Sequence, residues 1–583
     1  MEMEKEALKK RIDAAAGRTP ADLVIKNCRI VDVYNAAILE NQSIAMVDGC
    51  IAGIGDYTGI REIDGAGQYA LPGFIDGHIH IESSYVTPEE IGRLLVPHGA
   101  ATIIADPHEI VNVCGMDGLD FMLAAARQTK LDIRFMLPSC VPATPFENAG
   151  AIVDAAAMEK PIRDEQILGL AEFMNFPGVI HADDDVLDKL LVAMGAGKLI
   201  DGHSPGLGGR DLNAYAACGI HTDHECSTTE EMLDRLSRGM YVLLREGSAC
   251  HNLRTLLRAV TPANSRRCVL CSDDRQPETI LTLGHLDNHL RICVEEGLDP
   301  IIAVQMATLN AAECFGLRDR GAIAPGLRGD IVLVDNLQDF QVRRVFIRGE
   351  EVALNGKYLP AVEYCDNSSV RGSMHVKDFS AARLRLPLQS NRVHVIDILP
   401  GGVVTGKGIA EVTRNRQGEF VYDPGQDIVK VAVIERHRCT GNVAVALLRG
   451  YGIKAGAVAL SIAHDSHNII VAGVNDGDMA FAVEQLVEQG GGILLAKDEE
   501  VIDAMPMVVG GIMSDQSGEW VSEKLKQLHT AAYGRLGVSR QVEPIMTLCF
   551  MSLPVIPELK LTDLGLFDVT KFAFIPLEAD VGE

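Results

Sequence analysis

The chain of 583 residues is 47% hydrophobic and 23% charged, a composition that excludes a disordered, collagen-like or coiled-coil protein. Its 53 Lys and Arg residues against 80 Asp and Glu residues give a net charge of −27. That charge disfavours nucleic acids and anionic membrane surfaces as partners, because both bind clustered positive charge. The sequence has no run of about 18 apolar residues for a membrane span and no apolar N-terminal stretch typical of a secretory signal. With 14 scattered cysteines, we expect a cytoplasmic protein with reduced thiols.

The first and last parts of residues 1–375 have the composition of β structure. Residues 1–70 contain LVIKNCRIVDV and SIAMVDGCIAGIG, and Asp48-Gly49 is a hairpin signal. Similar segments, GDIVLVDNL and RRVFIRGEEV, return within residues 321–375. We therefore predict one small β-sandwich domain built from both flanks of a long central block, followed by a polar linker.

The central block, residues 71–320, repeats a short apolar strand, a polar residue and a helical stretch. Strands are expected at 73–80, 101–106, 132–138, 167–172, 199–203, a segment ending at His224, 241–246 and 268–273. Eight units at roughly thirty-residue spacing predict a (β/α)8, TIM-like barrel, in which functional residues lie at the carboxyl ends of the strands. Cys268 and Cys271 lie within the last strand and are interpreted as core residues.

The remaining residues, 376–583, predict a separate C-terminal α/β domain. Its clearest strands are RVHVIDIL and IVKVAVIE, and it has glycine-rich turns such as Gly490-Gly491-Gly492. The same region contains His464 and His467 in HDSHN. These two histidines could form a third metal site, belong to an element that closes over the barrel mouth, or have a structural role.

Six of the eight predicted strands end in, or just before, a histidine or a carboxylate. His78 and His80 alternate on the first strand, so their side chains share one face. This HxH pair alone is a weak signal, but the other strand ends supply matching groups. Glu172 is the candidate bridge between two cations, because a carboxylate has two oxygen donors. The predicted two-metal site at the barrel mouth consists of His78, His80, Glu172, His203, His224 and Asp273.

Longer motifs around these positions carry a family resemblance. LPGFIDGHIHIES, the later DGH and SDD resemble the amidohydrolase superfamily. ADPHEIVNVCG, DGHSPGLGG, NAYAACGIHTDHE, CSDDRQP, AHDSHNIIVAG and LPVIPELKLTDLGLFD together resemble the bacterial adenine deaminase family over nearly the whole chain.

The resemblance implies a role for each predicted ligand. Glu172 takes the place of the carboxylated lysine found in other binuclear members. His224 is preferred over His221, because the family motif places a histidine immediately before a glutamate. Asp273 matches the catalytic aspartate of the last strand. The resemblance favours two manganese or iron(II) ions, and the imidazole and carboxylate set also accepts zinc.

The implied reaction is hydrolysis of adenine to hypoxanthine and ammonia. Two divalent cations would lower the pKa of a shared water that attacks C6, and Asp273 would pass its proton to the departing ammonia. Attack pushes electrons onto N1, so N1 needs a proton donor. A neutral carboxyl whose pKa is raised by burial would serve, and the sequence leaves Glu225 and Glu109 as equal candidates.

Four further residues are candidate substrate contacts. Asp106 and His108 follow the second strand and could bind the purine edge, or else cap the loop. Ser83, like its neighbour Ser84, could contact substrate or cap a helix. Asp274 would either support Asp273 or touch the substrate.

Two other hypotheses remain open at this stage. The same site could act on another aminopurine or a cyclic amide, or the barrel could be a metal-free binding module. The presence of all six predicted ligands argues against the module. A homodimer is the default expectation for the assembly.

Overall fold

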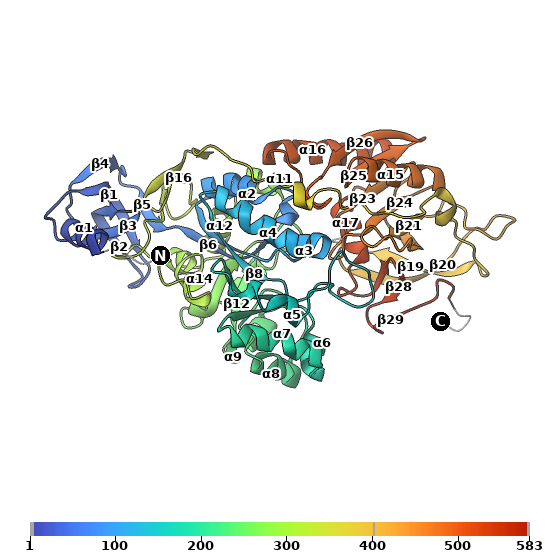
Figure 1. Ribbon diagram of the computed structural model, residues 1–583, viewed down its shortest axis with the longest axis horizontal. Coiled ribbons are helices and arrows are strands. Elements are labelled where there is room, and N and C mark those ends of the chain that lie inside the picture. The colour runs from blue at the N-terminus through green and yellow to red at the C-terminus, as the bar shows by residue number, and fades with distance from the viewer. Residues whose placement is uncertain (1–4, 400–402, 580–583) are drawn as a thin grey trace.

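The computed structural model describes residues 5–399 and 403–579. They form three parts in a row, with a β part at one end, a barrel in the centre and the C-terminal part at the other end (Figure 1). Within the described ranges, no helix has the length and apolar character that a membrane-spanning segment needs.

The barrel wall consists of parallel strands at the predicted positions. They are β6 (Phe74–His80), β7 (Ala100–Ala105), β8 (Asp132–Leu137), β9 (Ile167–Phe173), β10 (Leu199–Gly202), β11 (Thr222–Asp223), β12 (Tyr241–Arg245), β13 (Cys268–Cys271) and β14 (Asp273–Asp274). The pairing order is β10-β9-β8-β7-β6-β14 and β11-β12-β13. The His221 N–H donates to the Ile200 carbonyl (2.9 Å) where β10 meets β11. The predicted TIM-like barrel is confirmed, with β13 and β14 together forming the eighth strand.

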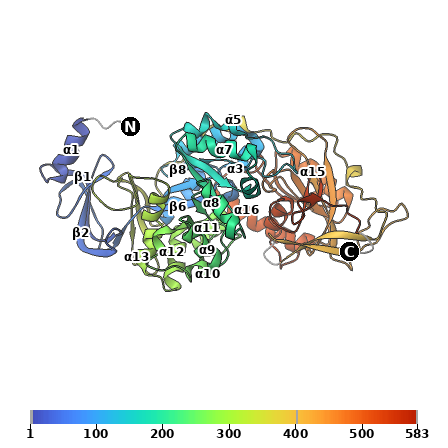
Figure 2. The same ribbon diagram turned by 90° about the horizontal axis from the view of Figure 1, so that it is seen from below.

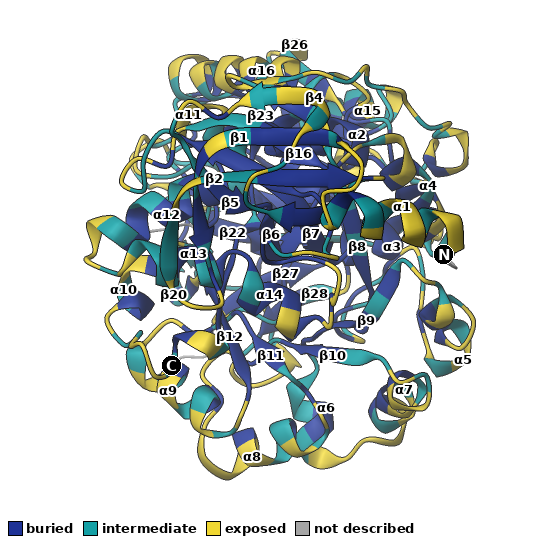
Figure 3. Cartoon of the chain, turned by 90° about the vertical axis from the view of Figure 1, so that its left-hand side faces the viewer, coloured by how far each residue is buried: buried dark blue, intermediate teal, exposed yellow. Residues whose placement is uncertain are grey.

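Helices cover the outside of the barrel, where they carry most of its exposed residues, whereas the strands are buried (Figures 2 and 3). Strands covered on both faces explain why β6 and β7 are buried along their whole length. The helices are α2 (Pro88–Leu95), α3 (His108–Cys114), α4 (Met116–Ala125), α5 (Ala155–Met158), α6 (Phe176–His181), α7 (Asp184–Gly195), α8 (Gly209–Ala217), α9 (Thr229–Ser237), α10 (Leu253–Leu257), α11 (Pro277–Leu283), α12 (Leu286–Glu295), α13 (Pro300–Met306) and α14 (Leu309–Cys314).

The strands of the two flanks join in one nine-stranded sheet. β5 pairs in parallel with β1 and antiparallel with β15, so it links the N-terminal flank to the segment after the barrel. Alternate residues of β1 enter different apolar clusters, one containing Leu23 and Ile25, the other Val24 and Ala14 of α1 (Lys5–Ala15). The strands are β1 (Ala21–Asp32), β2 (Ala37–Val47), β3 (Cys50–Ile54), β4 (Gly59–Asp64), β5 (Tyr69–Pro72), β15 (Ile331–Val334), β16 (Val342–Ile347), β17 (Glu350–Leu354) and β18 (Lys357–Tyr358).

The C-terminal part is a mixed α/β structure around an eight-stranded, mainly antiparallel sheet. The two strands predicted there are confirmed as β19 and β21. In sheet order the strands are β20 (Thr405–Glu411), β19 (Arg392–Ile398), β22 (Val443–Arg449), β21 (Ile428–Ile434), β24 (Ile469–Gly473), β23 (Ala457–Leu460), β25 (Gly492–Lys497) and β26 (Glu500–Pro506). A three-stranded sheet follows from β27 (Leu559–Thr562), β28 (Gly565–Asp568) and β29 (Ala573–Phe574), and the helices are α15 (Asp476–Glu488), α16 (Gly518–Ala531) and α17 (Met546–Cys549).

The C-terminal part contacts the loops at the carboxyl ends of the barrel strands. The Ser514 N–H donates to the Tyr85 carbonyl (2.8 Å) just after β6. The Glu109 carboxylate accepts a hydrogen bond from His464 of the loop between β23 and β24 (2.6 Å). This contact places the C-terminal part over the end of the barrel where functional residues are expected.

Candidate active site

A cavity of about 410 Å³ lies where the barrel mouth meets the C-terminal part. This volume is in the range of small-molecule sites, roughly 300–1,000 Å³. The barrel side of the cavity carries histidines and carboxylates, and the C-terminal side is largely apolar. The lining residues are His80, His108, Glu109, Glu172, Met174, His203, Pro205, His224, Glu225, Ser227, Arg245, Ala249, Cys250, Asp273, Asp274, Val403, Val404, His464, Asp465, Phe550, Leu553, Val555, Ile556 and Pro557.

The HxH pair at the end of β6 presents two ring nitrogens toward each other. The Nε2 atoms of His78 and His80 lie 3.1 Å apart. The Nδ1 of His78 lies 3.2 Å from the Asp201 carboxylate, and the Nδ1 of His80 lies 3.1 Å from the Asp106 carbonyl. An acceptor at Nδ1 fixes the tautomer and leaves Nε2 free to bind a cation.

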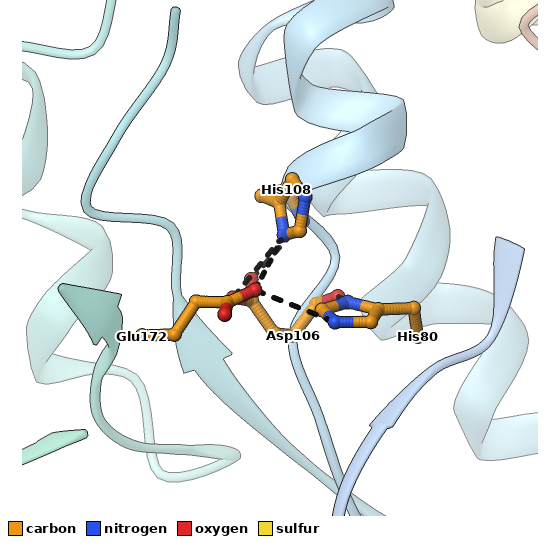
Figure 4. Close-up of side chains that lie close together, drawn as sticks. All are labelled: His80, Asp106, His108 and Glu172. Atoms are coloured by element: carbon orange, nitrogen blue, oxygen red, sulfur yellow. Dashed lines mark hydrogen bonds and ion pairs between the residues drawn. The ribbon is translucent and has the colours of Figure 1, made fainter. Parts of the chain in front are cut away.

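Glu172, at the end of β9, lies between two groups of histidines. Its Oε1 is 3.4 Å from His80 Nε2 and 3.4 Å from His108 Nδ1, the arrangement drawn in Figure 4. Its Oε2 is 2.7 Å from His203 Nδ1 and 3.1 Å from His224 Nε2. Each oxygen therefore faces its own set of imidazoles, which is the geometry that a bridging carboxylate requires.

Asp273 completes the ring of groups from the last strand. Its Oδ1 is 3.3 Å from His80 Nε2, and its Oδ2 accepts a hydrogen bond from Arg245 Nη1 (2.6 Å). The backbone of Asp273 has φ 58°, a left-handed conformation that is uncommon outside glycine. Ser272 is fixed beside it by two hydrogen bonds to the buried Asp76 carboxylate. This local conformation interrupts the eighth strand and turns the carboxylate toward His80.

The donor set fits divalent cations. Several groups of three or four His, Asp and Glu side chains have their ligand atoms within 4.8 Å of one another. The Oδ2 of Asp106 and the Nδ1 of His108 are buried and lie 3.3 Å apart as an ion pair without hydrogen-bond geometry, so a cation between them would satisfy both. Burial opposes charge on His224, yet Glu172 and other carboxylates raise its pKa to about 10, as expected where negative charge is in excess.

The six predicted ligands come together in this cluster, and Asp106 and His108 join them. Asp106 and His108 are the candidates for binding the purine edge or capping the loop after the second strand. Their side chains share a group with His80 and Glu172 (Figure 4). Cys250 also lines the cavity, but burial raises its pKa to about 12, so it remains a neutral thiol.

Neither candidate proton donor, Glu225 or Glu109, has the raised pKa that we expected for a neutral buried carboxyl. Glu225 and Glu109 do line the cavity. Burial favours the neutral form of each and is the largest single effect, but Arg245, His203 and His224 together outweigh it and lower the pKa of Glu225. His464 and His467 outweigh it at Glu109 and hold that pKa well below the usual range. Burial alone was a poor guide because each carboxylate has basic partners that the sequence did not reveal.

Asp274 and Ser83 form a hydrogen-bonded pair at the cavity edge. Asp274 lines the cavity and accepts a hydrogen bond from the Ser83 hydroxyl, whereas Ser83 is buried behind it. Burial and the neighbouring Asp273 raise the pKa of Asp274. Ser84 donates to the Ile81 carbonyl within the same turn, so the two serines organise the turn after β6.

The two histidines near β11 lie in different surroundings. His224 stacks on His78, with ring centroids 4.0 Å apart. His221 precedes β11, and its ring lies 5.0 Å from the Tyr241 ring. Tyr241 starts β12, so the His221 ring lies at the amino ends of the strands, at the end of the barrel opposite Glu172.

Sequence reasoning missed Arg245 and Asp201. Arg245 ends β12 and pairs with both Glu225 and Asp273, and the rule of functional strand ends could have found it. Asp201 lies two residues before His203, so strand alternation could have indicated that it faces the same interior.

Two family models match the chain. The "Amidohydrolase family" model matches residues 69–352, and the "Adenine deaminase C-terminal domain" model matches residues 402–573.

Relatives extend over nearly the whole chain. The chain is 66% identical over 577 residues to "Adenine deaminase 2" of Desulfotalea psychrophila, covering 99% of this chain and 100% of the relative. It is 54% identical to "Adenine deaminase" of Ligilactobacillus salivarius, with 99% and 100% covered. It is 52% identical to "Adenine deaminase" of Nitratidesulfovibrio vulgaris strain DP4, with 97% of each covered.

Proposed function

The chain belongs to the adenine deaminase family, and from this premise we propose that it hydrolyses adenine to hypoxanthine and ammonia. The observation that carries the proposal is Glu172, whose two oxygens face separate sets of histidines on the wall of one cavity. A C–N hydrolysis at a purine carbon needs an activated water and positioned proton carriers, and this cavity offers the groups for both.

The residues that would hold two divalent cations are those of the cluster. When bound, the cations would supply an acidified water for attack on C6. Manganese or iron(II) is proposed and zinc is compatible, because imidazole and carboxylate ligands accept all three. The proposed ligands are His78, His80, Glu172, His203, His224 and Asp273, with Asp106 and His108 adjacent.

Asp273 is proposed to carry the proton between water and leaving group. Its Oδ2 is held by Arg245, and its Oδ1 faces the cluster beside His80. It would accept a proton from the attacking water and deliver it to the amino nitrogen as the C6–N bond breaks. The C6–O bond forms, ammonia leaves with the first water proton, and the second water proton returns to the group that protonated N1.

The proton for N1 would come from the Glu109 or the Glu225 side of the cavity. Arg245 cannot release a proton at neutral pH, so it cannot pass one to Glu225. Glu225 therefore stays ionised in this pair and would have to take a proton from water before donating it to N1. Glu109 shares a short hydrogen bond with His464 (2.6 Å), a partner that can exchange protons. The variants Glu109→Gln and Glu225→Gln separate the two assignments, because the donor's variant should lose kcat while adenine still binds.

The test is conversion of adenine by protein loaded with Mn²⁺ under reducing conditions, followed by ultraviolet absorbance and ammonia release. His224→Asn should abolish metal-dependent turnover, and His221→Asn should retain it, because His221 lies outside the cluster. Two bound metal ions without adenine turnover would instead favour another aminopurine or a cyclic amide.

We also propose a cytoplasmic location and a homodimeric state. The described cysteines are free rather than paired, and several are buried, as in proteins kept reduced. The dimer follows only from the general preference for twofold assemblies. Light scattering on the purified protein tests it, and a monomer would contradict it.

A further inference from the structure

The loop between β23 and β24 brings two polar side chains of the C-terminal part into the cavity wall. These are His464 and Asp465. The fully buried Arg436 holds the loop in place, because its guanidinium donates to the carbonyls of His467 and Ser461. The loop is therefore a built part of the site.

His464, Glu109 and His467 lie close enough to suggest a third cation site, but their hydrogen bonds indicate otherwise. The Ala463 N–H donates to Nδ1 of His467 (3.2 Å), so the proton of neutral His467 lies on Nε2. That nitrogen faces Glu109 Oε2. A protonated ring nitrogen cannot bind a metal, so His467 is not a metal ligand here. The Glu109 carboxylate instead lies between the two rings, hydrogen-bonded to His464 and in contact with His467.

Glu109 and Phe550 fix the orientation of the His464 ring. Its Nδ1 is bonded to Glu109 Oε1 at 2.6 Å. One face stacks on Phe550, with centroids 4.6 Å apart and an interplanar angle of 19°. The side chain is only 10% exposed. Nε2 is the ring nitrogen left to meet a ligand in the cavity.

The surroundings of His464 suit a flat aromatic base. Next to it, Phe550, Leu553, Ile556 and Val403 form an apolar wall opposite the polar cluster of the barrel. Small-molecule sites combine such apolar walls with a few placed polar groups that give specificity. A purine has apolar faces, and its edge carries ring nitrogens that accept hydrogen bonds.

We propose that His464 is a substrate-binding residue that donates a hydrogen bond from Nε2 to a ring nitrogen of the purine, so that the C-terminal part completes the binding site. This inference rests on the proposed function. Burial disfavours charge on His464, but Glu109 raises its pKa to about 9, which agrees with a ring that donates at neutral pH.

Two substitutions separate binding from a structural role. Gln at position 464 carries its amide near the place of Nε2, whereas Asn carries it near Nδ1 and can keep the bond to Glu109. If His464 binds the purine, His464→Asn should impair binding more than His464→Gln. If His464 only joins the two parts of the chain, the order should reverse, and the loss should appear in thermal stability.

The experiment measures kcat and KM for adenine, and the Kd for hypoxanthine by calorimetry, on metal-loaded full-length variants. A lost hydrogen bond to a charged group predicts a roughly 10- to 100-fold rise in KM and Kd for His464→Asn. His529→Asn is the matched control, because His529 pairs with Glu543 away from the cavity and should leave both constants unchanged.

The outcomes are distinguishable. Wild-type KM and Kd in His464→Asn, or the reversed order of the two variants, would overturn the inference while adenine turnover by the wild type upheld the proposed function. If the wild type turns over no adenine, the proposed function fails and this inference falls with it. If His464→Asn does not fold, His464→Leu removes the donor while keeping an apolar side chain beside Phe550, and unchanged KM and Kd in that variant would overturn the inference.

Discussion

Replacing Arg245 with methionine tests whether its guanidinium holds the carboxylates of Glu225 and Asp273 in place. Arg245 Nη1 bonds to Asp273 Oδ2 (2.6 Å) and to Glu225 Oε1. The side chains are 8%, 9% and 16% exposed for Arg245, Asp273 and Glu225, so solvent screens these charges little. Methionine retains much of the volume and leaves both carboxylates without their cation.

The magnitude follows from this burial. Removing one partner of a buried ion pair costs about 3–5 kcal/mol of unfolding free energy. A charge-assisted hydrogen bond contributes about 1.5–3 kcal/mol. If the hydrogen bond to Asp273 contributes all of this free energy to stabilising the transition state, its loss should lower kcat/KM about 10- to 100-fold, since 1.36 kcal/mol corresponds to a tenfold change in rate.

Urea unfolding and adenine turnover of metal-loaded protein provide the assays, with metal content measured on the same samples. Arg245→Lys should recover only part of the loss, because a lysine cannot span both carboxylates as a planar fork does. Arg267→Met is the control, since Arg267 stacks on Tyr241 (4.5 Å), which starts β12 at the opposite end from Arg245. An Arg245→Met protein with wild-type stability and kcat/KM would refute the reasoning.

Three further predictions concern the metal cluster and the wall of the cavity. Glu172→Gln should bind no more than one metal ion per chain and lose about 100-fold or more in activity; two ions by elemental analysis with full activity would contradict the bridging role. Chelation should lower the melting temperature, because ions bound only to the folded state stabilise it by about 4 kcal/mol at a thousandfold excess over Kd; an unchanged temperature on calorimetry would show that the cluster needs no cation. Burial lowers the pKa of Lys560 to about 7, so between pH 7 and 9 the unfolded chain binds more protons than the folded one, and stability should rise by about 2 kcal/mol. Lys560→Met should remove that part of the slope in urea titrations, and an identical slope in both proteins would disprove the buried neutral lysine.

The barrel could be predicted because its strands are short apolar runs ending in polar residues. The sequence does not show that the eighth strand is broken at Ser272. That break depends on Asp76, almost two hundred positions earlier, whose carboxylate holds Ser272 by two hydrogen bonds. A left-handed residue fixed by a tertiary contact leaves no periodic signal.

The cluster around Glu172 could be predicted from strand ends, but its neighbours could not. Arginine is not a metal-ligating residue type, so the pattern of ligands gave no sign of Arg245, the cation that pairs with Glu225. The contact between Glu109 and His464 joins segments far apart in the chain. Such contacts arise when two folded parts pack, and neither segment's residue pattern encodes its partner.

The pairing of β5 with β15 has a consequence for the order of folding. Pro72 faces Ile331 and Tyr69 faces Val334 in this ladder, so the whole barrel lies in the sequence between two adjacent strands. Pairing over such a separation forms slowly, because the intervening chain must first be brought together. Until the barrel has formed, β5 has an open edge, and open edges are sites of aggregation. A chain that ended before β15 would keep the edge of β5 open permanently. A cut at residue 72 would likewise part β5 from β15, so the N-terminal flank cannot be separated cleanly from the barrel there.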